Sequence, residues 1–167
     1  SDISIVIDAN WRDIFWRNSK DSSQLVMNYQ VQKIKKFLSK ADILKLSNEE
    51  ANLFFENNNP FQISQHLSKN PDVIITNGEQ PIRWFIDGIK GVTQVSKSSR
   101  IVDTTGAGDS FLAGLISQFL SQKTNSKQKS LEKYIQFAST CGLISCLGEG
   151  AIEPQPNVQQ IQDFLRA

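Results

Sequence analysis

Residues 103–114 read DTTGAGDSFLAG, where two glycines flank one small residue and an acid opens a helical pattern. Glycine allows the tight turn that points successive backbone N–H groups at one place. The helix predicted after this turn adds its positive end there, which makes a site for a phosphate-like anion. Asp109 stands at the edge of that site, where a carboxylate is suited to take a proton from the group that attacks the phosphate. The stretch therefore indicates phosphoryl transfer.

A purely structural interpretation stays open, since glycine-rich strand-to-helix turns are common and an Asp in the first helical turn favours the helix. Two other phosphate-binding motifs are excluded. A Walker loop needs Gly-Lys followed by Ser or Thr, and the sequence has no such run. The dinucleotide fingerprint needs a third glycine where Phe111 stands.

Apolar periodicity places strands and helices alternately along most of the chain. The predicted strands are residues 3–8, 42–46, 72–76, 82–86 and 89–95, and the predicted helices are residues 24–38, 108–120, 131–147 and 158–166. Ser47 begins a further helix with Glu50 in a capping box, and one more helix follows an Asn-rich loop. Asp87-Gly88 signals a two-residue hairpin, and residues 121–130 read as a polar, exposed loop. The alternation predicts a mainly parallel sheet between layers of helices, with sites at the carboxyl ends of the strands.

The chain has 167 residues, of which 39% are hydrophobic and 21% charged, with a formal net charge of +1. This is enough for one domain with a core, and it gives no electrostatic reason to expect nucleic acid as a partner. We find no membrane-spanning run and no signal peptide, so we expect a soluble cytoplasmic protein without a membrane partner. Cys141 and Cys146 face different sides of a predicted helix and are expected to be reduced thiols, and His66 is expected at the surface.

The run from Asp103 to Phe111 resembles the C-terminal signature of the PfkB family of sugar kinases, which has the ribokinase-like fold. Segments that resemble bacterial and plant fructokinases are residues 8–12 (DANWR), 41–50 (ADILKLSNEE), 137–142 and 150–152. The resemblance implies a three-layer α/β/α sandwich with a mainly parallel sheet. It also implies ATP-dependent phosphorylation of a sugar hydroxyl, first of all that of fructose. A 2-keto-3-deoxygluconate kinase, another PfkB sugar kinase and a kinase-like binding protein without turnover remain alternatives.

PfkB chains are typically longer than this one. The resemblance therefore implies that residues 1–167 form the C-terminal nucleotide and phosphoryl-transfer portion of a PfkB sugar kinase. The N-terminal part and the lid, which carry several sugar contacts, are expected to be missing from it. We accordingly expect these residues alone to bind nucleotide weakly and not to phosphorylate sugar. The partners are expected to be a small-molecule sugar and ATP, with a homodimer as one option for the full-length form.

The resemblance assigns roles to the residues of the glycine turn. The backbone N–H groups of Gly106, Ala107 and Gly108 would hold the charge that develops on the transferred phosphoryl group. Asp109 would contact the sugar and accept the proton of its hydroxyl. A modest base suffices for this step, because positioning does most of the work in a loose transition state.

Two ion sites are implied as well. Glu50 resembles the family acid that holds magnesium, usually through water, although a helix-capping role explains this residue equally. Asp103 and Thr105, with the loop around Ser145 and Gly150, resemble the potassium site of many ribokinase-like enzymes. Asp103 could instead simply cap the turn.

Residues on the nucleotide side are implied at Thr76, Gly78, Thr105 and Ser139. Two departures from the family bear on these contacts. Ser139 stands where relatives often have Asn, and Pro81 stands where many have a second glycine.

Asp8, Asn10 and Arg12 alternate in the sequence and share one face if the preceding strand continues through them. An acceptor, an amide and a fixed cation on one face suit phosphates or sugar hydroxyls better than a core. We expect Asp8 to bind the substrate and Asn10 and Arg12 to contact the nucleotide. Trp11, between them, is expected to be a packing residue.

Overall fold

The computed structural model describes residues 3–12, 24–121 and 127–166, and it divides into two compact units. The first unit comprises residues 1–77 and 83–91, and the second comprises residues 78–82 and 92–167. Within the described residues, none of the helices is long and apolar enough to cross a membrane.

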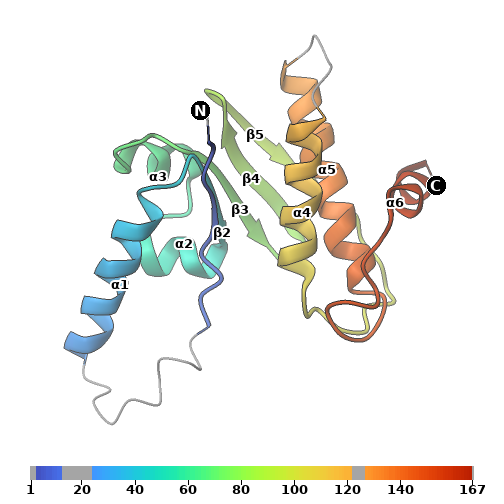
Figure 1. The fold of residues 1–167 in the computed structure, drawn as a ribbon, viewed down its shortest axis with the longest axis horizontal. Coiled ribbons are helices and arrows are strands. Elements are labelled where there is room, and N and C mark those ends of the chain that lie inside the picture. The colour runs from blue at the N-terminus through green and yellow to red at the C-terminus, as the bar shows by residue number, and fades with distance from the viewer. Residues whose placement is uncertain (1–2, 13–23, 122–126, 167) are drawn as a thin grey trace. The chain divides into compact units, whose positions relative to one another are not determined.

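A five-stranded sheet has the strand order β1-β2-β3-β4-β5. Its strands are β1 (Val6–Asp8), β2 (Ile43–Ser47), β3 (Asp72–Asn77), β4 (Gln80–Ile86) and β5 (Ile89–Thr93). The first three strands pair in parallel, with Ile7 beside Leu44 and Leu44 beside Val73 (Figure 1). Two-residue connections on either side of β4 require antiparallel pairing, so every strand except β4 points the same way. The predicted mainly parallel sheet is confirmed.

The connection between β4 and β5 is the predicted hairpin. Asp87 has φ 54° and Gly88 has φ 78°. Positive φ at both central residues is what a type I′ turn requires, and an Asp-Gly pair adopts it readily. Farther along β5, Gly91 leaves room for the buried Trp84 ring, because a Cβ there would lie 2.0 Å from that ring. The hairpin therefore follows from local sequence and from one close packing contact.

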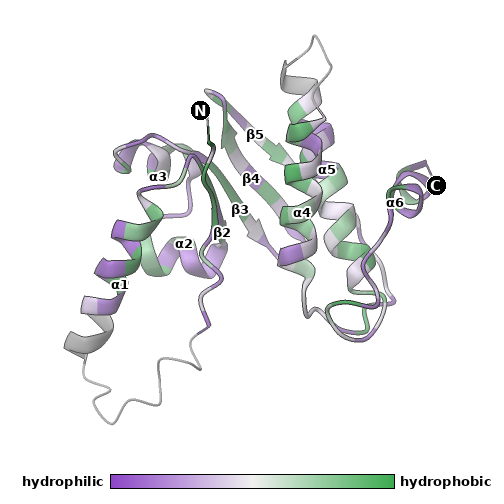
Figure 2. Ribbon diagram, in the orientation of Figure 1, coloured by the Kyte–Doolittle hydropathy of each residue, from purple (hydrophilic) through white to green (hydrophobic). Residues whose placement is uncertain are grey.

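Three helices accompany the strands of the first unit: α1 (Gln24–Leu38), α2 (Asn48–Phe55) and α3 (Pro60–His66). The predicted capping box begins α2, where the Ser47 side chain accepts from the Glu50 N–H and the Glu50 side chain accepts from the Ser47 N–H. Asn59 caps α3, where its side chain accepts from the N–H groups of Phe61 and Gln62. Apolar side chains of β2, β3 and these helices form one core, and the middle of β3 has a hydrophobic colour in Figure 2.

The second unit contains α4 (Ala107–Leu120), α5 (Lys127–Ser145) and α6 (Val158–Arg166). Small residues let α4 and α5 run side by side (Figure 1). A Cβ on Gly114 would lie 2.6 Å from the Cys141 sulfur, and the Ser110 hydroxyl donates to the Cys141 carbonyl at 3.1 Å. Ile161 of α6 packs against Phe137 and Cys141 of α5. These contacts set the position of the first turn of α4.

Several predicted boundaries need correction. β1 begins at Val6 and not at residue 3, because Ile3 is 80% exposed and has no place in the core. β5 ends at Thr93 and not at residue 95. The helix predicted from residue 131 begins at Lys127, so residues 127–130 were wrongly taken as loop: Lys and Gln are good helix formers even without an apolar pattern. Residues 122–126 of that predicted loop lie outside the described residues.

Candidate functional site

The first turn of α4 has the geometry of an anion site. Gly106, the residue before the helix, has φ 80°, and a Cβ there would lie 2.9 Å from the Cβ of Ala151. Only glycine satisfies both the backbone angle and the close approach of that loop. No side chain caps the helix, so the first-turn N–H groups depend on other acceptors. The Ala107 N–H turns back to the Thr104 carbonyl at 3.2 Å, which leaves the following N–H groups as the donors of interest.

Asp103 ties this turn to the loop at Gly150. One carboxylate oxygen accepts from the Thr105 hydroxyl at 2.7 Å and from the Thr105 N–H at 2.9 Å. The other oxygen accepts from the Gly150 N–H at 3.0 Å. The hydrogen bond from the Thr105 hydroxyl, followed by those from the backbone N–H groups of Thr105 and Gly150, lowers the pKa of Asp103 below its ordinary value. Asp103 therefore holds two loops together as an ionised acceptor.

Asp109 is exposed in the first turn of α4. Among the described residues, its carboxylate takes part in no hydrogen bond or ion pair. Its neighbour Ser110 is buried and binds α5, so one of the two consecutive side chains packs against the next helix while the other faces solvent. An exposed carboxylate beside an uncapped helix start is free to meet a ligand.

The other candidates in the second unit lie along α5. Ser145 is fully buried and donates to the Gly142 carbonyl at 2.8 Å. Ser139 is 7% exposed. Its neighbour Thr140 contacts the Ser96 hydroxyl at 3.2 Å and so ties α5 to the segment after β5. Cys141 and Cys146 are free and buried, in agreement with the predicted reduced thiols, and burial raises the pKa of the Cys141 thiol to about 11.

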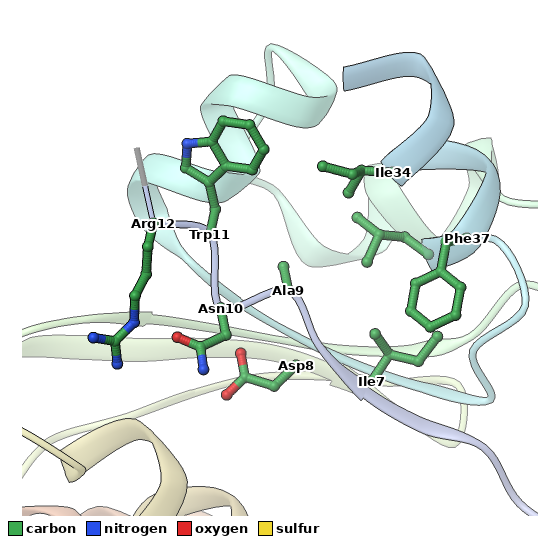
Figure 3. Close-up of a pocket in the computed structure, with 9 residues that line it drawn as sticks. Ile7, Asp8, Ala9, Asn10, Trp11, Arg12, Ile34 and Phe37 are labelled. Atoms are coloured by element: carbon green, nitrogen blue, oxygen red, sulfur yellow. The ribbon is translucent and has the colours of Figure 1, made fainter. Parts of the chain in front are cut away.

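In the first unit, the segment after β1 lines a cavity of about 410 Å³ together with α1. Ile7, Ala9, Ile34, Phe37 and Leu38 supply the apolar lining. The predicted strand does not continue, because β1 ends at Asp8 and Asn10 has φ 42°. The side chains of Asp8, Asn10 and Arg12 nevertheless gather on one side of this segment, while Trp11 points away from them (Figure 3). A left-handed turn, and not strand alternation, produces the shared face.

Lys45 forms an ion pair with the candidate residue Asp8 that the sequence alone did not predict. Its ammonium donates to Asp8 Oδ2 at 2.8 Å, and the two side chains are only 9% and 12% exposed. The other Asp8 oxygen is buried without a hydrogen-bond partner in the described structure. The signal was a lysine inside an otherwise apolar strand, but its partner depends on the register that places Asp8 beside Lys45.

Glu50 is 7% exposed, and both of its oxygens are already engaged. One accepts from the Trp11 N–H at 2.6 Å and the other from the Ser47 N–H at 2.7 Å. The capping role is thus confirmed, and the magnesium role stays a prediction. Among the described residues, no three His, Cys, Asp or Glu side chains come together as a metal site.

The remaining candidates lie at the end of β3. The Thr76 hydroxyl reaches the Leu46 carbonyl at 3.4 Å, a long hydrogen bond. Gly78 has φ 53° and open space where a side chain would be. Pro81 lies in β4.

A profile of the family described as "pfkB family carbohydrate kinase" matches residues 6–158. The chain is 31% identical over 164 residues to the probable fructokinase-7 of Arabidopsis thaliana. This match covers 95% of the chain and 45% of the Arabidopsis protein. It spans about half the length of the curated relatives that it matches first.

Two solved structures show the same α/β fold. The fructokinase with bound ATP from Xylella fastidiosa matches with a TM-score of 0.78 and 19% identity, over 98% of the chain and 52% of that protein. A fructokinase double mutant from Vibrio cholerae O395, in a fructose, ADP and potassium ion bound form, matches with a TM-score of 0.77 and 22% identity, over 97% of the chain and 50% of that protein.

Proposed function

The chain belongs to the pfkB family of carbohydrate kinases, and we propose that it supplies the nucleotide and phosphoryl-transfer portion of an ATP-dependent sugar kinase. The observation that carries this proposal is the uncapped start of α4, with Gly106 at φ 80° and the exposed Asp109 one turn later. An anion site and a free carboxylate at one helix end suit phosphoryl transfer better than helix capping.

In the proposed reaction, a sugar hydroxyl oxygen attacks the terminal phosphorus of ATP, and the bond between that phosphorus and ADP breaks. Asp109 accepts the proton that the hydroxyl loses. The N–H groups of Gly106 and Gly108 hold the charge on the transferred phosphoryl group, whereas the Ala107 N–H is bonded to the Thr104 carbonyl. Asp103 contributes by fixing the turn against the loop at Gly150.

Fructose is the proposed sugar. The support is the likeness to fructokinases, one of them solved with fructose bound, and the polar side of the cavity. Asp8 would accept a sugar hydroxyl, while Asn10 and Arg12 would meet phosphate oxygens. Thr76, Gly78 and Ser139 complete the proposed nucleotide contacts. The polar side of the cavity also suits a sugar acid, so 2-keto-3-deoxygluconate is the second candidate.

A potassium ion near Asp103, Thr105, Ser145 and Gly150 is the least supported part of the proposal. Both Asp103 oxygens already accept hydrogen bonds, Gly150 presents its N–H, and the Ser145 hydroxyl is turned to a carbonyl. These groups do not by themselves build a cation site, so we assign no step to the ion.

The experiment uses a form of the protein that has the full length of its relatives. Asp109→Asn should lower kcat by about 100-fold or more, the low end for a general base, and leave the melting temperature unchanged. Glu132→Gln, an exposed acid on α5, is the matched control and should keep full activity. Turnover of Asp109→Asn near that of the control would reject the assignment.

Assaying the same form against a sugar panel tests the substrate, and a preference for 2-keto-3-deoxygluconate would replace fructose without changing the mechanism. Residues 1–167 alone span about half the length of the relatives that they match first, and the proposal assigns the lid and further sugar contacts to the other half. These residues should therefore bind an ATP analogue weakly in calorimetry and show no turnover. Robust turnover by these residues would contradict the proposed division of the enzyme.

A further inference from the structure

We propose that Glu50 is a positioning residue, which holds the segment Asn10–Arg12 in place and is not a magnesium ligand. The proposal rests on the proposed function, because that segment lines the cavity assigned to sugar and phosphate. It goes beyond that function because it assigns Glu50, the only buried acid of α2, to positioning the segment Asn10–Arg12 and not to binding magnesium.

The first observation is the pair of hydrogen bonds at the carboxylate. Glu50 Oε1 accepts from the Trp11 N–H at 2.6 Å, and Oε2 accepts from the Ser47 N–H at 2.7 Å. Both distances are short for N–H donors, as expected when the acceptor carries a charge. The bond to Trp11 spans 39 positions of the sequence and is not needed to begin the helix.

The second observation is that a further residue of α2, Phe54, also contacts Trp11. Phe54 follows Glu50 by one helical turn and therefore lies on the same face of α2. Its ring meets the Trp11 indole edge to face, with 5.8 Å between the ring centroids and 88° between the planes. Phe54 is 1% exposed, so this contact is part of the core. Both the backbone and the side chain of Trp11 are thus fixed to α2.

Fixing Trp11 sets the direction of its two neighbours. The chain turns at Asn10 with φ 42°, a conformation that costs energy outside glycine and needs support from its surroundings. The side chains of Asn10 and Arg12 are exposed and lie on the polar side of the cavity (Figure 3). Without the bond at the Trp11 N–H, the turn and both side chains lose the contact that anchors their backbone to α2.

Magnesium does not fit the same carboxylate. The ion needs near-octahedral oxygen ligands from one or two carboxylates and water, and a metal-bound water would have to donate to a buried oxygen that already accepts a short N–H bond. Here two N–H groups point at Glu50, and a cation at that place would be repelled by both. The acid next in reach along the segment, Asp8, is paired with Lys45. The donor set is that of a bound carboxylate and not of a metal site.

The test uses amide NMR on residues 1–167 and needs no enzymatic turnover, so a failed kinase assay and a failed positioning role remain distinguishable. In Glu50→Gln, one carboxylate oxygen is replaced by an NH2 group, which cannot accept a hydrogen bond. The Trp11 amide should move upfield, and its hydrogen exchange should accelerate about 10-fold or more. Glu49→Gln, an exposed acid in the same helical turn, is the matched control and should leave the Trp11 amide unchanged.

A second measurement needs no variant. Mn²⁺, a paramagnetic substitute for magnesium, is added to the unmodified chain. The amides of Trp11 and Ser47 should broaden no more than amides distant from any acid. Selective broadening of these two signals would overturn the proposal, and so would equal exchange rates at Trp11 in the Glu50→Gln and Glu49→Gln variants.

Discussion

Replacing Lys45 by Met tests whether the buried ion pair beneath the cavity supports the first unit. The Lys45 ammonium lies 2.8 Å from Asp8 Oδ2, with both side chains nearly removed from water. Met keeps most of the length and the apolar stem of Lys but not its charge. Asp8 would then keep a buried carboxylate without a partner for either oxygen, since Oδ1 has none in the present structure.

Removing one partner of a buried ion pair costs about 3–5 kcal/mol, because the remaining charge stays desolvated. We expect the free energy of unfolding of the first unit to fall by that amount. Combining Lys45→Met with Asp8→Asn removes the stranded charge, so the double variant should recover much of the loss.

Urea unfolding followed by tryptophan fluorescence measures this effect, because the two tryptophans that the structure describes, Trp11 and Trp84, belong to the first unit. The matched control is Lys69→Met, since Lys69 meets Asp42 at the same 2.8 Å but with 44% and 37% of the two side chains exposed. The control should unfold like the unmodified chain. Equal midpoints for Lys45→Met and Lys69→Met would refute the reasoning.

Three further predictions concern the second unit. Gly106→Ala and Gly150→Ala each place a side chain on a backbone with φ near 80°, which costs about 1–2 kcal/mol. Only the Ala at position 106 also clashes with Ala151, so Gly106→Ala should lower the thermal midpoint further than Gly150→Ala. Equal shifts of the two midpoints would contradict this prediction. Because the pKa of Asp103 is lowered in the folded protein, its hydrogen bond to the Gly150 N–H is fully present above the ordinary pKa of 3.8 and is lost as the pH falls through the folded-state pKa. Hydrogen exchange of the Gly150 amide should therefore accelerate at acid pH. In Asp103→Asn it should be fast already at neutral pH. Because the pKa of Cys141 is about 11, its native thiol should react with a disulfide reagent at pH 8 at least about 100-fold more slowly than in urea, and similar rates would disprove its burial.

The predictions that the structure confirms depend on residues close together in the chain. The capping box at Ser47 and Glu50 spans three residues, and the hairpin at Asp87-Gly88 spans two. The glycine turn before α4 is equally local, because glycine is the residue that takes φ 80° without strain. The predicted helix boundaries are wrong where no such signal exists. At the start of α5, the first turn consists of polar helix formers without an apolar pattern, so the sequence did not predict it.

The sequence by itself therefore determined the order of strands and helices, the helix caps and the glycine turn before α4, since each is governed by the conformational preferences of neighbouring residues. Only the tertiary structure decided that Lys45 meets Asp8, 37 positions away, and that Glu50 holds Trp11, 39 positions away. The first pair depends on the register of β1 on β2, and the second on the turn at Asn10. No local preference encodes such contacts, because they exist only once the packing of the core has brought distant segments together.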